Sequence, residues 1–293
     1  MIPLFTVLLF GFGESPLGFI IAAGLLFMLA VMLVSALRTG AKAISEQQAK
    51  NGHTDYGADA RFAINYQLAD FSYFRKLSQN GKQEFIRRIL NFIETHTIDG
   101  IGNYNPELNE KIHVAAAATQ LTFGLNDFAF THFETIILYP GIFRMQEGGP
   151  LMKGATTPNG EIRISIRDFK EGYANPTDKL NVGLHEFGHA LFMEFLKKSN
   201  EDNEKKLKNK MHPYLQTSDK MLYEGKHNDT FLRAYAFKNR HEFFAVSVEH
   251  FFEAPKEFKE KLPELYVLIK DLLQQDPASD KMDYGIVRNY QVV

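Results

Sequence analysis

The sequence predicts an α+β fold that follows a single N-terminal transmembrane helix. The transmembrane helix is predicted by residues 17–37, which carry no charged side chain. The α+β class is predicted downstream, where apolar residues recur at the spacing of amphipathic helices and two short runs have the composition of strands. The chain has 293 residues, of which 45% are hydrophobic, so it is long enough to bury a substantial core.

Charge and cysteine content exclude several classes of protein. The formal net charge is −2, so the chain lacks the basic character of a nucleic-acid-binding protein, and we expect no nucleic-acid partner. It has no cysteine, which excludes disulfide scaffolds, cysteine-ligated metal sites and cysteine nucleophiles. Any bound metal must therefore be held by His, Asp or Glu.

The apolar segment has the length of a membrane span. A helix over residues 17–37 rises about 31 Å at roughly 1.5 Å per residue, which matches the ~30 Å hydrocarbon core of a bilayer. A secretory signal peptide would need a positively charged region before it, and no Lys or Arg precedes residue 17. Basic residues follow the segment instead, at Arg38, Lys42, Lys50 and Arg61. By the positive-inside rule, that side faces the cytoplasm.

The chain is thus predicted to have three parts. These are a membrane anchor over residues 1–40, a linker or helix extension over 41–60, and a folded domain over 61–293. The expected location is a single-pass membrane protein with its domain in the cytoplasm.

The domain is predicted to begin with two helices and then two strands. Apolar residues in Gln83–His96 recur with the 3.6-residue period of an amphipathic helix. Leu108–Leu125 is also predicted to be helical, with an alanine-rich middle that allows close packing. The β-branched run Glu134–Tyr139 is followed by Pro-Gly and is predicted to be a strand. In Glu161–Phe169, isoleucines alternate with arginines and a serine, which predicts a half-exposed strand.

The rest of the domain is predicted to be mostly helical. One helix runs from about Asp178, the expected N-cap, to Lys198. The mixed charges of Glu201–Lys210 are typical of a solvent-exposed helix face. Asn239–Glu253 and Pro263–Gln275 are predicted to be the last two helices.

An HExxH pentapeptide lies in the predicted helix 178–198. His185 and His189 are four residues apart, so they project from one face of the helix and can share one metal ion. Two imidazoles suit Zn²⁺, and Glu186 between them is placed to take a proton from a metal-bound water. The pentapeptide alone leaves open a pair of partly buried histidines that only pack.

A catalytic zinc site needs a third protein ligand. A metzincin would have Gly and His at the positions of Phe192 and Phe195, so that class is excluded. The remaining class takes a downstream glutamate, and the candidates are Glu194, Glu224, Glu242, Glu249 and Glu253. Glu242 and Glu249 lie on one face of the predicted helix 239–253, where a carboxylate is costly unless it is paired or metal-bound. We expect one of them to be a ligand and the other to hold the second nitrogen of a histidine.

Tyr235 lies seven residues before Glu242, in the turn that leads into the same helix. A phenol there could donate a hydrogen bond to the oxyanion that forms at a substrate carbonyl. The alternative is an ordinary packed aromatic side chain. His241 and His250 also lie on this helix. A packing role is the main expectation for His250, and an approach to the cleft is the alternative. Surface or packing roles are expected for the other histidines, namely His53, His96, His113, His132, His212 and His227.

HEFGH, followed by Tyr235 and then Glu242, resembles the Mlc titration factor A family of zinc-dependent peptidases. The resemblance covers about Ala115–Pro255 and includes the segments ILYPGIF and NVGLHEFGHAL. The same spacing of Tyr and Glu is found in the catalytic domain of anthrax lethal factor. The resemblance implies a zincin-like metallopeptidase domain of the gluzincin type, with a small sheet packed on the HExxH helix and a mostly helical C-terminal half.

The resemblance also implies the roles of the site residues. In the family, the two histidines and the downstream glutamate bind zinc, the glutamate of HExxH is the base, and the tyrosine assists. In this chain the implied ligands are His185, His189 and Glu242, and the implied catalytic residues are Glu186 and Tyr235. Family members usually carry HEFAHxLD, from which this chain departs at Gly188 and Phe192. If the acid that Phe192 replaces supports the site, its loss affects the tuning of the site and not the ligands.

The leading prediction is a membrane-anchored zinc metallopeptidase, a hydrolase that cleaves peptide bonds in peptide or protein substrates. Zn²⁺ is the one cofactor expected, and the strand Glu161–Phe169 is expected to align an extended substrate by edge pairing. The alternative is a membrane-tethered zinc-binding regulatory protein that docks a partner such as a transcriptional repressor. The intact Glu186 favours the enzyme, because a scaffold has no chemical need for a base.

Overall fold

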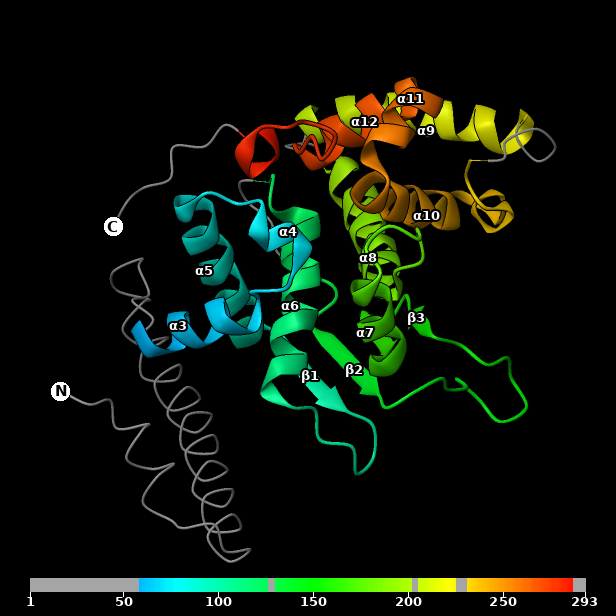
Figure 1. Cartoon of the computed structure of the whole chain (residues 1–293). Helices are drawn as coiled ribbons and strands as arrows, with labels where there is room; N and C mark the ends of the chain where they lie inside the picture. Colours follow the sequence, from blue (N-terminus) through cyan, green and yellow to red (C-terminus); the bar gives the residue numbers. More distant parts are fainter. Residues whose placement is uncertain (1–57, 126–129, 202–204, 225–230, 287–293) are drawn as a thin grey trace, which may run out of the picture. The chain divides into compact units, whose positions relative to one another are not determined.

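The computed structural model describes residues 58–125, 130–201, 205–224 and 231–286 (Figure 1). The predicted transmembrane helix over residues 17–37 and most of the predicted linker lie outside these ranges. Within them, the chain forms ten α-helices and one four-stranded sheet, which confirms the α+β class. None of the helices in these ranges is both long and apolar enough to cross a bilayer.

The sheet has the strand order β1-β2-β4-β3. The strands are β1 (Thr97–Gly100), β2 (Thr135–Tyr139), β3 (Gly154–Thr156) and β4 (Glu161–Ser165). β1, β2 and β4 are parallel, and β3 pairs with β4 in the antiparallel direction. Because β4 is paired on both sides, the prediction that it aligns a substrate by edge pairing is wrong. The short strand β3 (Gly154–Thr156) is the edge of the sheet on that side, and no strand was predicted over its residues.

The predicted strand Glu161–Phe169 is also too long. The chain turns into helix α7 (Ile166–Ala174) directly after Ser165. The Ser165 hydroxyl accepts a hydrogen bond from the backbone N–H of Asp168, which is the capping contact that begins a helix. Serine followed three residues later by an acid is a recognisable start signal, and here it prevails over the alternating pattern.

The helices of the first half lie close to their predicted bounds. α3 (Ala58–Gln67) and α4 (Ser72–Arg75) come first, and then α5 (Gln79–Thr95) and α6 (Leu108–Thr122) pack against each other. α5 begins four residues earlier than predicted because the Ser78 hydroxyl accepts the N–H of Gly81 and caps the helix.

Helix α8 (Val182–Ser199) carries the HExxH motif, and it begins later than predicted. Asp178 is not its N-cap; its carboxylate accepts the N–H of Leu180 in the preceding turn. Lys179 has a left-handed backbone with φ of 65°, which interrupts a helix at that point. The cap is Asn181, whose side chain accepts the N–H of Leu184.

The second half is helical, as predicted. Its elements are α9 (Lys205–Glu224), the 3₁₀ helix η2 (Ala234–Lys238), α10 (Arg240–Glu253), α11 (Pro255–Lys261), α12 (Pro263–Leu273) and the 3₁₀ helix η3 (Met282–Gly285). α8 runs between this group and the sheet (Figure 1), and it packs against β3 and β4 at one side and against α9 and α10 at the other.

Phenylalanines fill the core on both sides of α8. Phe187 is fully buried and packs on Phe92 of α5 and on Phe130. Phe192 is also fully buried and stacks on Phe244 of α10, with ring centroids 5.1 Å apart. Each such side chain contributes about 1.5–3 kcal/mol by burial. α8 is therefore fixed from two directions, and the side chains between these contacts have little freedom to move.

Candidate metal centre

Two histidines project from one face of α8. His185 and His189 are one helical turn apart, and their Nε2 atoms lie 3.1 Å from each other. The two ring planes meet at 87°, so the rings lie edge to face while their Nε2 atoms converge. Because Asn181 caps α8, both histidines belong to its first two turns.

Helix α10 brings a carboxylate to the same point. Asn239 caps α10 by accepting the N–H of Glu242, which puts Glu242 in the first turn. Its Oε2 lies 3.1 Å from His185 Nε2 and 3.3 Å from His189 Nε2. One ligand atom from each of the three residues lies within 4.8 Å of the others. This is the one group of His, Asp and Glu side chains in the described ranges that is arranged to hold a metal ion.

The donor set fits zinc. Imidazole nitrogen and carboxylate oxygen are both common zinc ligands, and three protein ligands leave one position of a tetrahedral site open for substrate or water. Calcium and magnesium prefer sites made of oxygen alone. The side chains of His185, His189 and Glu242 are only 11–13% exposed, so a bound ion would be shielded on the protein side.

Glu249 contacts His185 at Nδ1, the ring nitrogen that does not face the other two ligand atoms. Its Oε1 lies 2.7 Å from His185 Nδ1, which leaves Nε2 free to face the other two ligand atoms. The backbone N–H of Asn181 donates to Glu249 Oε2 at 2.9 Å, and Arg233 contacts both carboxylate oxygens. A carboxylate in this position orients a histidine ligand and raises its basicity. The contact matches the expectation that one of Glu242 and Glu249 would hold a histidine nitrogen.

These contacts shift the protonation of the group. Burial disfavours charged His185, but hydrogen bonds with Glu242 and Glu249 outweigh this effect and raise its pKa to about 10. Burial likewise opposes ionisation of Glu242, yet the two histidines and Tyr235 hold its pKa well below the usual range. Without a metal, the positive charge of His185 compensates the carboxylates. A metal ion must displace that proton, so its affinity depends on pH.

Glu186 lies next to the sheet and not among the ligand atoms. It is 5% exposed, and burial raises its pKa. The Thr156 hydroxyl of strand β3 lies 2.8 Å from its Oε2. A buried carboxyl with a raised pKa is suited to accept and return a proton near neutral pH.

Tyr235 in η2 reaches the group from the solvent side. Its hydroxyl donates to Glu242 Oε1 at 2.9 Å, and burial together with this bond raises its pKa to about 12. The residue is 48% exposed, so its ring is not buried in the core. The phenol keeps its proton at neutral pH and can act as a donor.

The other candidate residues lie elsewhere. Glu194 is buried and accepts the backbone N–H of His132, which fixes a loop. Glu224 is exposed at the end of α9. Glu253 accepts a hydrogen bond from the Asn181 side chain and does not reach the ligand atoms. His250 contacts the backbone carbonyls of Val246 and Phe231 and has a packing role.

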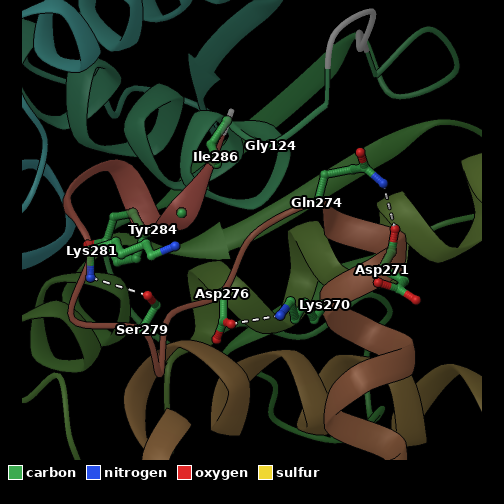
Figure 2. Close-up of a pocket in the computed structure, with 10 residues that line it drawn as sticks. Gly124, Lys270, Asp271, Gln274, Asp276, Ser279, Lys281, Tyr284 and Ile286 are labelled. Carbon is green, nitrogen blue, oxygen red and sulfur yellow. Dashed lines mark hydrogen bonds and ion pairs between the residues drawn. The ribbon is translucent and has the colours of Figure 1, made fainter. Parts of the chain in front are cut away.

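A polar hollow of about 370 Å³ lies near the C-terminal end of α12 (Figure 2). It shares no lining residue with the group on α8 and α10. The groups that line it bond to one another, since Lys270 pairs with Asp276 and the Gln274 side chain donates to the Asp271 carbonyl (Figure 2). The hollow is therefore a structural feature apart from the candidate centre.

Residues 58–274 match the family model described as glucose-regulated metallo-peptidase M90. The chain belongs to this family. It is the Mlc titration factor A family, so the resemblance found in the sequence is confirmed. The M90 match covers α8, η2 and α10, and thus every residue of the candidate centre. No curated protein matches the sequence.

Sequence reasoning missed the residues that support the M90 centre. Arg233 and Asn181 contact Glu249, and Thr156 contacts Glu186. Asn181 could have been found, because an Asn before an apolar helical run is a cap signal. Arg233 and Thr156 carry no local signal, since their partners are 16 and 30 residues away in the chain.

Proposed function

We propose that this M90 metallopeptidase is a membrane-anchored zinc enzyme that hydrolyses peptide bonds. The observation that carries the proposal is the convergence of His185, His189 and Glu242 within 4.8 Å, with the buried carboxyl of Glu186 on the same helix. When bound, Zn²⁺ would polarise the carbonyl of the peptide bond that is cleaved and lower the pKa of a water toward about 7.

The proton transfers fall to Glu186. It accepts the proton of the attacking water and returns it to the nitrogen of the amine that leaves. Burial suits it to both steps, because a raised pKa brings it closer to neutral pH. Tyr235 is proposed to turn its hydroxyl from Glu242 to the oxyanion, and its exposure of 48% leaves it room to do so.

The substrate is proposed to lie along strand β3. This strand pairs with β4 on one edge and packs against α8. A peptide that adds to an unpaired edge is held by backbone hydrogen bonds, whatever its sequence. This assignment replaces the edge pairing expected of β4.

A purely regulatory role is the competing function. A protein that only docks a repressor needs the zinc site as a scaffold but has no use for a buried base. Glu186 has a raised pKa and a hydrogen-bonded position, and keeping such a carboxyl buried is costly. Its presence favours catalysis.

The test compares the zinc-loaded full-length chain, purified in detergent, with Glu186→Gln. The substitution keeps the ligands and the shape but removes the base. We expect the rate of peptide hydrolysis to fall by about 100-fold or more, while zinc content stays equal. Equal rates in the two proteins, or no hydrolysis by the wild-type chain, would reject catalysis by this site.

The membrane anchor and its orientation are a separate part of the proposal. They rest on the uncharged residues 17–37 and on the basic residues that follow them. A C-terminal reporter that is active only in the cytoplasm should be active, and the protein should sediment with membranes. Activity of a reporter that works only outside the cytoplasm would reverse the orientation.

A further inference from the structure

The edge strand β3 contacts the proposed base directly. The Thr156 Oγ1 lies 2.8 Å from Glu186 Oε2 and 2.9 Å from the backbone carbonyl of the same residue. One hydroxyl thus lies against both the side chain and the main chain of Glu186. A side chain anchored in this way loses much of its rotational freedom.

Gly154 at the start of the strand leaves space for the other carboxylate oxygen. A Cβ atom built on Gly154 would lie 2.4 Å from Glu186 Oε1 and 2.5 Å from its Cγ. These separations are far inside van der Waals contact, so any other residue would push the carboxylate away. The glycine is needed here for space, because its φ is not in the left-handed region.

The two residues act from the same face of the strand. Side chains two positions apart in a strand point to one side, so the position of Gly154 and the side chain of Thr156 both face α8. Their places are fixed by the register with β4, in which Gly154 lies opposite Ile164 and Thr156 opposite Ile162. Both isoleucines are fully buried. The strand is therefore a rigid support for the carboxylate.

We infer that Thr156 and Gly154 are positioning residues for Glu186. Thr156 fixes one carboxylate oxygen, and Gly154 leaves the gap that the other occupies. The inference rests on the proposed function and deepens it, because the strand proposed to pair with substrate also holds the base. Misplacing a catalytic group by about 1 Å can cost about 100-fold in rate, so a single hydroxyl can matter this much.

Thr156→Val is the main test, carried out on the zinc-loaded full-length chain. Valine keeps the shape of threonine and removes the hydroxyl. We expect kcat to fall by about 10- to 100-fold, with KM within about twofold and zinc content unchanged. Thr156→Ser restores the hydroxyl and should recover the rate to within about threefold of wild type.

Thr157→Val is the matched control. Thr157 is the next residue, and its hydroxyl lies near the backbone of Glu161 in the turn between β3 and β4, not near Glu186. The kcat of Thr157→Val should stay within about twofold of wild type. Gly154→Ala should lower kcat as Thr156→Val does, because the added methyl displaces the carboxylate without changing any hydrogen-bonding group.

A binding measurement separates this inference from the proposed function. Acetohydroxamic acid gives up a proton to a nearby base when it binds a divalent metal, so its affinity, measured by calorimetry, reports the placement of Glu186 without turnover. We expect Thr156→Val and Glu186→Gln to weaken it by about 10-fold or more, and Thr156→Ser to restore it.

The outcomes are distinct. A wild-type chain that cleaves no peptide but shows this series of affinities would reject the proposed function and keep the positioning role. Thr156→Val that matches wild type in both affinity and rate would overturn the inference. A Thr156→Ser variant with the same affinity and rate as Thr156→Val would also overturn the inference. The effect would then come from packing and not from the hydroxyl.

Discussion

Two regions of the α8–α10 interface are built in different ways. The charged region joins Asn181 and His185 of α8 to Glu249 and Glu253 of α10 through hydrogen bonds. The aromatic region joins Phe192 of α8 to Phe244 of α10 by ring stacking. The charged region fixes the orientation and protonation of ligand groups, while the aromatic region contributes burial energy and fixes how the helices pack.

Gly188, between the two histidines of HExxH, lets the helices approach closely. A Cβ atom at this position would lie 3.3 Å from Ala245 Cα of α10. The family resemblance implies alanine here, and with glycine the two site helices pack with one methyl group less. The close approach brings Glu242 within reach of both histidines.

Phe192 lies three residues after the HExxH motif, at a position where the family resemblance implies an acid. Its side chain is fully buried between Phe244, Tyr214 and His241. An ionised carboxylate would be costly in such surroundings. The aromatic region therefore extends to the helical turn that follows His189, and Glu249 is the carboxylate that contacts His185 Nδ1.

The largest expected effect comes from breaking the aromatic region. Phe244→Ala removes a fully buried ring and should lower the free energy of unfolding by about 3–5 kcal/mol. Thermal unfolding of the full-length chain in detergent should show a midpoint roughly 10 °C lower. Val267→Ala, at a half-exposed position, is the control and should shift the midpoint little. Equal shifts for the two variants would mean that stacking at Phe244 adds no stability.

The charged region should control metal affinity more than stability. Glu249→Gln removes the charge that holds His185 Nδ1 and Arg233, and it should weaken zinc binding by about 10- to 100-fold. Competition with a chelator measures this. The matched control is Glu257→Gln, which removes a carboxylate paired with Lys179 at the surface and should leave zinc affinity unchanged. If Glu249→Gln bound zinc as tightly as wild type, the charge of Glu249 would not be needed for His185 to bind the metal.

The smallest effect concerns Glu253 and depends on pH. Burial and the nearby charge of Glu249 raise its pKa to about 8 from an ordinary value of 4.5, and its Oε2 is buried with no hydrogen-bond partner in the described part of the chain. Between these two pH values, the folded state keeps a proton that the unfolded state releases. The free energy of unfolding therefore falls as pH rises through this window.

Glu253→Gln should remove this dependence. We expect the variant to match wild type near pH 5 and to be more stable than wild type near pH 8.5. Urea unfolding at the two pH values measures the difference. A variant that is less stable than wild type at both pH values would show that the carboxyl makes a favourable interaction when ionised.

Local sequence determined which residues could do the chemistry. HExxH places two histidines on one helix face whatever the rest of the chain does, because four residues are close to one helical turn. Glu242 and Glu249 share a face of α10 because seven residues are close to two helical turns. The choice between them was not local, and from the residues alone both remained candidates.

Tertiary structure decided how these residues are held. Glu242 meets the histidines, and Glu249 lies behind His185, only because of the way α8 and α10 pack. The strand β3 is three residues long, too short for any alternation to appear in the sequence, and it exists through its pairing with β4. Arg233 and Thr156 act across the fold on partners that no spacing predicts. Periodicity determines the face on which a side chain lies, but the packing of distant segments determines what that face meets.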